Sequence, residues 1–71
     1  MSERRIRLQT ARKRKDITQK EMAKRLNISN SSYWKKEKGD KEFLCSEMIC
    51  IAKELNESLD YLFMVEEEDN D

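Results

Sequence analysis

The strongest constraint on the fold of this 71-residue chain is a series of helix-capping signals in its N-terminal half. Thr18 followed by Glu21 forms a capping box, in which each side chain binds the backbone N–H of the other residue at the start of a helix. Asn27 tolerates the left-handed conformation that ends a helix, Ser29 is a second N-cap, and Gly39 stops a second helix. The stretch therefore predicts two short helices joined by a turn of three or four residues, which is a helix-turn-helix.

Apolar periodicity predicts one more helix before this motif and two after it. The first helix spans about residues 4–14, the two motif helices about 18–26 and 30–38, and the fourth about 44–55. Ser58 caps a short fifth helix. Because the chain has no proline and one glycine, we predict an all-α bundle of five short helices that contains the helix-turn-helix.

The same periodicity predicts which side chains face the core. Tyr33 takes the inward position of the second motif helix. Outside the motif, the residues expected to face inward are Ile6, Leu8, Ala11, Cys45, Met48, Ile49, Ala52, Leu55, Leu59, Leu62 and Phe63. Tyr61, Met64 and Val65 remain as exposed apolar side chains, which is how an interface looks in sequence.

The charges are distributed unevenly, although the formal net charge is zero. Residues 1–41 hold fourteen of the fifteen Lys and Arg residues against five acids, a net charge of +9, and residues 42–71 carry a net charge of −9. The basic half contains the motif, as a phosphate-binding surface requires. We expect a helix-turn-helix domain over residues 1–65 and a disordered acidic tail over residues 66–71.

Several functions are disfavoured by what the sequence lacks. There is no histidine, and Cys45 and Cys50 form neither a C-x-x-C motif nor a disulfide framework, so we expect reduced thiols and no metal site. A glycine-rich phosphate loop and a nucleophile beside a base are also absent. We therefore expect no enzyme, no cofactor and no small-molecule substrate. The sequence shows neither a signal peptide nor a span long enough for a bilayer, so we expect a cytoplasmic protein without membrane contact.

The spacing of these motifs resembles that of the Cro/repressor family of phage and bacterial DNA-binding domains. The residues that carry the resemblance are Thr18-Gln19, Met22-Ala23, Ile28-Ser29, Glu37, Gly39, Ile51-Ala52-Lys53 and Ser58-Leu59-Asp60-Tyr61-Leu62. The resemblance implies a transcriptional repressor of a prophage or mobile element that reads the major groove of double-stranded DNA with the helix at 30–38. It also implies a homodimer on a palindromic operator, joined through the C-terminal helix. The alternative is a protein-interaction module, or an antitoxin-like partner, that kept the fold and lost the reading function.

The resemblance assigns roles to individual side chains. Asn30, Ser31 and Lys35 are expected to contact base edges, and Ser32 and Lys38 flanking groups. The complete set of expected DNA-binding residues is Arg12, Gln19, Ser29, Asn30, Ser31, Ser32, Trp34, Lys35, Lys38 and Lys41.

Three of these residues have a more specific role. Gln19, in the first turn of its helix, is expected to contact a phosphate, and Lys41 to contact the DNA backbone. Arg12 sits where the family has an arginine that pairs with the glutamate near the end of the reading helix, here Glu37, and it can still offer donors to a phosphate.

Four residues depart from the family pattern. Trp34 stands where the family has a small or polar residue, and Lys36 where it has an aliphatic residue or tryptophan. A tryptophan is more often buried than displayed, so we expect Trp34 to pack against the first or fourth helix; alternatively it is exposed and lies on a sugar or a thymine methyl. Asp16 occupies a turn where glycine or asparagine is preferred, and Phe43 replaces a proline.

Overall fold

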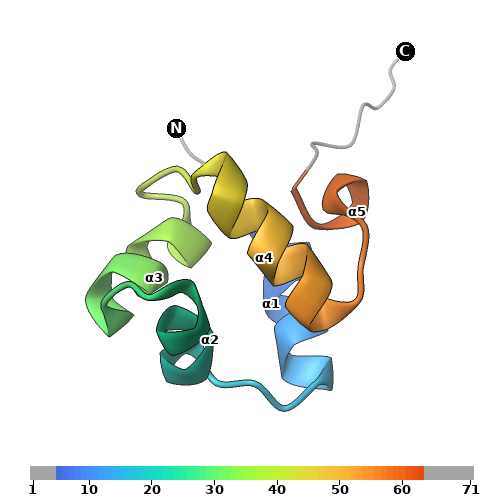
Figure 1. Cartoon of the computed structure of the whole chain (residues 1–71), viewed down its shortest axis with the longest axis horizontal. Helices are drawn as coiled ribbons and strands as arrows, with labels where there is room; N and C mark the ends of the chain where they lie inside the picture. Colours follow the sequence, from blue (N-terminus) through green and yellow to red (C-terminus); the bar gives the residue numbers. More distant parts are fainter. Residues whose placement is uncertain (1–4, 64–71) are drawn as a thin grey trace.

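A computed structural model describes residues 5–63, and this part of the chain forms five α-helices and no strand (Figure 1). The helices are α1 (Ile6–Arg14), α2 (Gln19–Leu26), α3 (Asn30–Lys38), α4 (Cys45–Leu55) and α5 (Leu59–Phe63). The predicted all-α bundle is confirmed. The capping box of Thr18 and Glu21 is present at the start of α2, and Ser29 caps α3 by accepting a hydrogen bond from the N–H of Ser32 at 3.0 Å.

Each of the first four helices is followed by a residue in the left-handed conformation. The φ angles are 59° at Asp16, 61° at Asn27, 99° at Gly39 and 55° at Asn56. After each of them the next N–H bonds to a carbonyl five residues back, as in Ile17 N–H to the Arg12 carbonyl at 3.1 Å, which is the Schellman pattern. Gly has no Cβ to oppose this conformation, and Asn and Asp tolerate it better than other residues because their short polar side chains can hydrogen-bond locally. These sharp stops let short links join successive helices.

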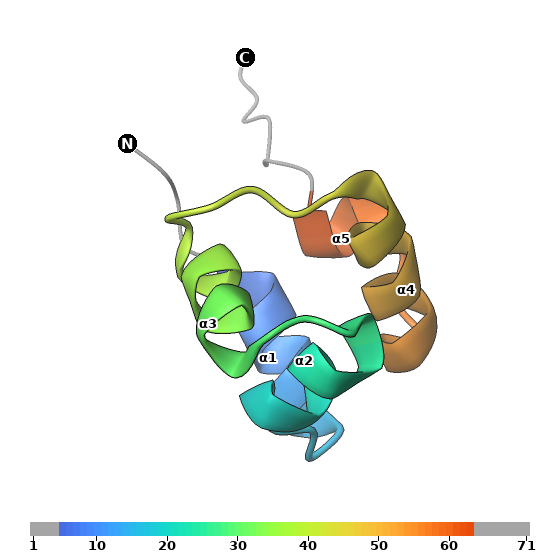
Figure 2. The ribbon, with the colours of Figure 1, turned by 60° about the vertical axis from the view of Figure 1, so that its left-hand side comes forward.

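The helices pack around one small core. α2 and α3 lie side by side at one edge of the bundle, and α5 packs against both α1 and α4 (Figures 1 and 2). Tyr33 is fully buried, as predicted, and its ring meets that of Phe43 edge-on, with the centroids 5.9 Å apart. Phe43 in turn contacts the ring of Phe63 at 5.4 Å. Phe43, which replaces the proline of the family, therefore packs the loop after α3 against α5.

Three apolar side chains near the ends of the bundle are not where the periodicity placed them. Ile6 is 56% exposed, because α1 turns Leu8, Ala11 and Arg12 to the core and Ile6 lies on the opposite side of the helix. Leu59 is also exposed. Tyr61, expected to be exposed, is half-buried, and the Arg7 guanidinium lies over its ring at 5.3 Å from the centroid. Met64, Val65 and the tail at 66–71 lie outside the described residues.

The predicted inward stripe of α4 is confirmed for Leu55, which is fully buried, and wrong for two of its other members. Cys45 and Ile49 are exposed, and the buried residues are Glu47, Ile51 and Leu55. Met48 and Ala52 are only partly buried at the edge of the core. The buried side of α4 is thus turned away from Cys45 and Ile49 and toward Glu47 and Ile51, relative to the orientation predicted from hydrophobicity.

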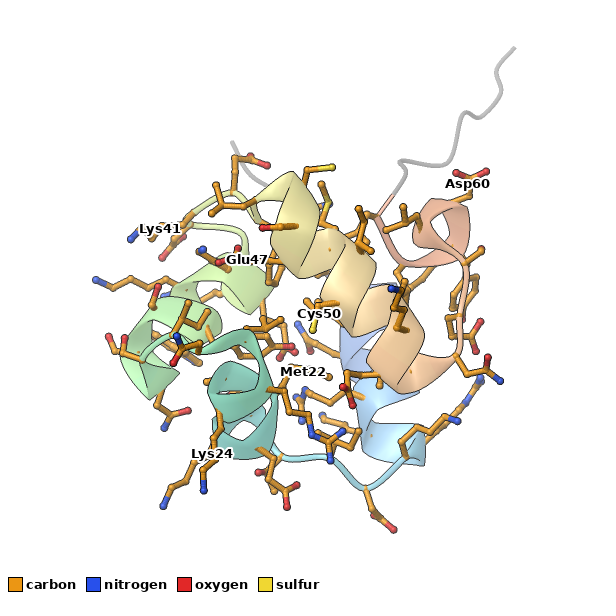
Figure 3. The ribbon with its side chains drawn as sticks, viewed as in Figure 1. Met22, Lys24, Lys41, Glu47, Cys50 and Asp60 are labelled. Atoms are coloured by element: carbon orange, nitrogen blue, oxygen red, sulfur yellow. The ribbon has the colours of Figure 1, made fainter. Side chains whose placement is uncertain are left out.

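The reason for this rotation is a buried ion pair between α3 and α4. Lys36 Nζ binds both carboxylate oxygens of Glu47, at 2.7 Å and 2.8 Å, and both side chains are buried. The Glu47 carboxylate also accepts the N–H of Leu44 at 2.8 Å at the start of α4 (Figure 3). Because a buried charge requires a partner, Lys36 draws Glu47 inward and turns Cys45 and Ile49 outward.

Lys36→Met is expected to lower the free energy of unfolding by about 3 kcal/mol or more, because it leaves the Glu47 carboxylate buried without its cation. Lys36→Met combined with Glu47→Gln is expected to recover most of this loss, since the amide keeps the bond to Leu44 without a buried charge. Urea denaturation followed by circular dichroism measures both variants.

The matched control is Arg25→Met. It breaks the Arg25–Glu54 ion pair, which has the same N–O distance of 2.7 Å but lies at the surface, so its cost is expected to stay below about 1 kcal/mol. Equal losses for Lys36→Met and Arg25→Met would contradict the structural role of the buried pair.

Candidate nucleic-acid interface

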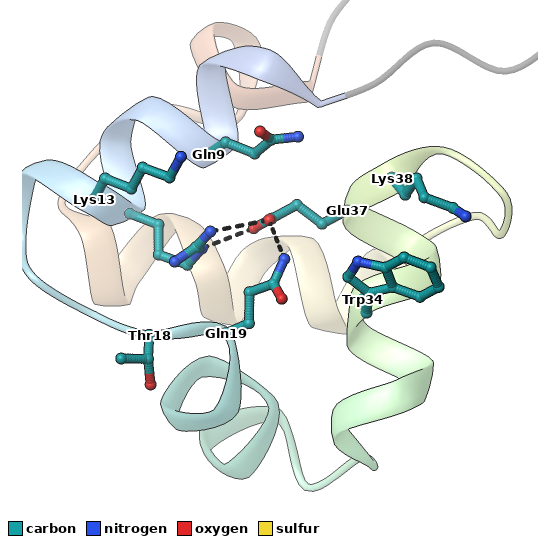
Figure 4. Close-up of a pocket in the computed structure, with 8 residues that line it drawn as sticks. Gln9, Lys13, Thr18, Gln19, Trp34, Glu37 and Lys38 are labelled. Carbon is teal, nitrogen blue, oxygen red and sulfur yellow. Dashed lines mark hydrogen bonds and ion pairs between the residues drawn. The ribbon is translucent and has the colours of Figure 1, made fainter.

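A buried network around the Glu37 carboxylate ties the two motif helices to α1. Arg12 donates from Nε to Glu37 Oε2 at 2.8 Å and from Nη2 to Oε1 at 3.0 Å, and its Nη1 binds the Ile17 carbonyl at 2.8 Å. The Tyr33 hydroxyl donates to Oε2 at 2.6 Å, and Gln19 Nε2 donates to Oε1 at 2.8 Å. The predicted pairing of Arg12 with Glu37 is confirmed. The network fixes the angle of α3 relative to the start of α2 (Figure 4).

The network also changes how its members ionise. Burial by itself would raise the pKa of Glu37, but the hydrogen bonds from Arg12, Tyr33 and Gln19 outweigh it and lower the pKa below its usual value of 4.5. Burial raises the pKa of Tyr33, and its hydrogen bond to Glu37 raises it further. Burial opposes the charge on Arg12, but Glu37 more than offsets this effect, so the pKa of Arg12 is raised. The site therefore keeps an ionised pair and a neutral phenol.

Opposite this buried network, α3 presents a polar face. Asn30, Ser31 and Lys35 are exposed, and Ser32 is half-buried in the first turn. The Ser29 hydroxyl already accepts the N–H of Ser32, so its part in this face is to cap the helix start. All three expected base-contacting residues are thus accessible to solvent on α3.

Trp34 lies on the same face and is 46% exposed. The expectation that it packs against the first or fourth helix is wrong, because Glu37 and Tyr33 take the inward positions of this part of α3. Lys38 Nζ lies over the indole at 3.9 Å from the ring centroid, a cation–π distance. The same ammonium is 3.2 Å from Asp40 Oδ2. Trp34 is therefore held in place by Lys38 rather than by the core.

A groove of about 500 Å³ runs between α1, the start of α2 and α3. We refer to it as the Trp34 groove; it is lined by Gln9, Arg12, Lys13, Thr18, Gln19, Trp34, Glu37 and Lys38 (Figure 4). Gln9, Lys13 and Thr18 were not among the expected site residues. Lys13 follows Arg12 directly in the sequence, but nothing in the periodicity of α1 distinguishes it from the other basic residues of that helix.

Two expected site residues lie away from the exposed face of α3. Arg12 is only 6% exposed and donates into the protein from all three nitrogens. Its contribution to the surface is therefore to position Glu37 and Gln19. Lys41 is exposed in the turn that follows α3.

Within residues 5–63 no cluster of three or more His, Cys, Asp or Glu side chains is placed to hold a metal ion. Cys45 and Cys50 are free thiols. None of the helices in this range combines the length and the apolar character needed to cross a membrane.

Comparison with known families gives one match. A family model described as a helix-turn-helix domain matches residues 6–68, which is most of the chain. No curated protein and no solved structure is significantly similar to it.

The lowered pKa of Glu37 predicts how stability depends on pH. Its ionised form stabilises the folded protein at pH values above the unfolded pKa of 4.5, and this contribution is lost as the pH falls through the lower folded pKa. In Glu37→Gln the free energy of unfolding is expected to be lower at neutral pH and to fall less between about pH 5 and pH 3 than in the wild type.

Urea denaturation across this pH range measures the difference, with Glu54→Gln at the exposed pair with Arg25 as the control. If both variants follow the wild-type pH curve, Glu37 does not carry the predicted linkage.

Proposed function

The chain belongs to the helix-turn-helix domain family and is of the Cro/repressor type, and from this premise we propose that it represses transcription by binding a specific site in double-stranded DNA. Membership of this family indicates a DNA-binding regulator, and its members are typically not enzymes. The observation that carries the proposal is the geometry of α3: one face is anchored by the buried Arg12–Glu37 pair, and the other offers polar side chains to solvent. A rigid helix with a free polar face is what reading base edges in the major groove requires.

In this proposal the first turns of α3 supply the base contacts. The amide of Asn30 pairs with adenine N6 and N7, the hydroxyl of Ser31 binds a donor or acceptor, and Lys35 donates to guanine O6 and N7. All three side chains are exposed and none of them is needed for the core. Ser32 and Lys38 make the flanking contacts.

Phosphate contacts set the position of the domain on the duplex. The first N–H groups of α2 have no partner within the helix, and Gln19 stands among them with its side-chain amide held by Glu37. The Ser29 hydroxyl caps α3 by accepting the N–H of Ser32 and can still donate its own hydrogen to a phosphate. Lys41, in the turn after α3, adds a contact on the other side. The net charge of +9 over residues 1–41 supplies the attraction that does not depend on sequence.

We propose that the protein acts as a homodimer on a palindromic operator, because one short helix offers only a few base contacts. Two copies related by a twofold axis would read half-sites about 34 Å apart. The C-terminal helix α5 is the proposed seam. Leu59 on α5 is exposed. Leu44, the residue before α4, and Ile49 on α4 are further exposed apolar side chains that a partner can cover.

The alternative function is a protein-interaction module or antitoxin-like partner. It is favoured by the same exposed apolar side chains, Leu44 and Ile49, which lie in the acidic half of the chain. The two functions differ in their binding to DNA. A repressor prefers one palindrome, and its affinity for DNA falls steeply as the salt concentration rises. An interaction module is indifferent to DNA.

The decisive experiment is selection of bound duplexes from a random pool by the purified full chain. The expected result is an enriched motif with twofold symmetry, which reports the half-site and the spacing. Enrichment of no motif, together with equal binding to all duplexes, would refute sequence-specific regulation.

Two substitutions separate reading from positioning. Lys35→Ala is expected to reduce discrimination at one base pair by about 1–3 kcal/mol, because a base contact is specific to its position. Gln19→Ala is expected to weaken all duplexes alike, because phosphates are the same in every sequence. Affinities for the selected operator and for each of its single-base variants measure both effects, with circular dichroism confirming the fold of Gln19→Ala.

Equal losses on every duplex from both changes would overturn the assigned roles.

A further inference from the structure

The Trp34 groove combines a flat apolar surface with cations. Trp34 contributes an indole that is about half exposed, Lys13 and Lys38 contribute ammonium groups, and Gln9 and Gln19 contribute amides. We propose that this groove holds one sugar–phosphate unit of the DNA backbone, with the deoxyribose packed on Trp34 and its phosphates bound by Lys38 and Lys13. This inference rests on the proposed DNA binding and adds a backbone subsite to it.

The electrostatics of the groove favour an anion. The acidic residue that lines the groove is Glu37. Its carboxylate already accepts hydrogen bonds from Arg12, Tyr33 and Gln19. Its charge is thus compensated inside the protein by Arg12. Lys13 and Lys38 are the other charged residues of the lining. Lys38 also pairs at 3.2 Å with Asp40, an exposed carboxylate outside the groove, and a phosphodiester can take the place of this surface ion pair.

Trp34 lies on the side of α3 that borders the groove to the start of α2. Around the helix axis Trp34 lies between Glu37 and Lys38, about 60° from the first and about 40° from the second, and Lys35 lies beyond Lys38, about 100° from Trp34. Glu37 is bonded to Gln19 at the start of α2. Since the first helix of this motif crosses the DNA backbone, the flank nearest Gln19 faces a strand rather than the middle of the groove.

The environment of the indole favours a sugar over a base. Lys38 Nζ already covers one face of the ring at 3.9 Å, so only the other face and the edge are free. Stacked base pairs present their edges in the major groove and not their faces, so ring-on-base stacking would require unstacking the duplex. A deoxyribose presents C–H groups that pack against an indole without any distortion, while Lys38 is placed beside the ring to meet the adjoining phosphate.

The test compares variants on two duplexes, the selected operator and a shuffled sequence of the same composition. Trp34→Ala is expected to weaken binding to both about five- to tenfold, because half an indole no longer becomes buried and a sugar carries no sequence information. Lys38→Met is expected to reduce the slope of log K against log salt by about 0.9, and Trp34→Ala to leave that slope unchanged. Trp34 is the one tryptophan of the chain, so its fluorescence is expected to change when either duplex is added.

The control variant is Ile6→Ala, which removes an exposed apolar side chain from the other side of α1 and is expected to leave both affinities unchanged. Replacing each operator thymine by deoxyuridine tests the competing role. If wild type loses affinity at one such position and Trp34→Ala does not, Trp34 reads a thymine methyl and the backbone subsite is wrong. If Trp34→Ala matches wild type on both duplexes, Trp34 makes no contact. In either of these cases the proposal of a sequence-specific regulator still holds if the wild-type protein prefers its operator. If the wild-type protein binds every duplex equally, both the regulator and the backbone subsite are refuted.

Discussion

The structure depends on one buried carboxylate, that of Glu37, and on the donors that surround it. Arg12 reaches it from α1, Gln19 from α2, and Tyr33 from α3 itself. A charge at this depth is stable only because every oxygen is bonded, so the network specifies one arrangement of three helices where a small apolar core would tolerate several. The backbone N–H of Arg5 adds a bond to the Glu37 carbonyl at 3.1 Å at the end of the same helix. The reading face of α3 is rigid because its back is anchored in this way.

A second buried charge pair governs the other half of the bundle. Lys36 and Glu47 join α3 to α4, and the position of Glu47 decides which side of α4 faces the core. The consequence reaches the surface, because Cys45 and Ile49 become exposed while Ile51 becomes fully buried. Cys45 and Ile49, which periodicity assigned to the core, are thereby left on the surface. Both charge pairs end on α3, so its two buried sides are held by electrostatics as much as by apolar packing.

The division of charge along the chain follows the division of tasks along α3. Of the basic residues before Glu42, Lys13 and Lys38 line the groove between α1, α2 and α3, and Lys35 is exposed on α3. The acidic half lies beyond α3 in the sequence. Trp34 is an exposed aromatic side chain on this helix. Its side chain is fixed by a lysine and not by the core, which leaves its apolar surface available to a ligand.

Local interactions explain how much the sequence by itself determined. The helices, the capping box at Thr18, the helix stops at Asn27 and Gly39, and the inward position of Tyr33 all depend on residues at most five apart, so they could be predicted from the chain. The pairing of Arg12 with Glu37 could be predicted only through resemblance to a family. What the tertiary structure alone decided is the rotation of α4, the exposure of Trp34 and the composition of the Trp34 groove. Each of these features depends on which residues meet across the core. Glu47 faces inward because it pairs with Lys36, and Trp34 is exposed because Glu37 and Tyr33 take the inward positions of α3. Hydrophobic spacing along one helix does not reveal such neighbours.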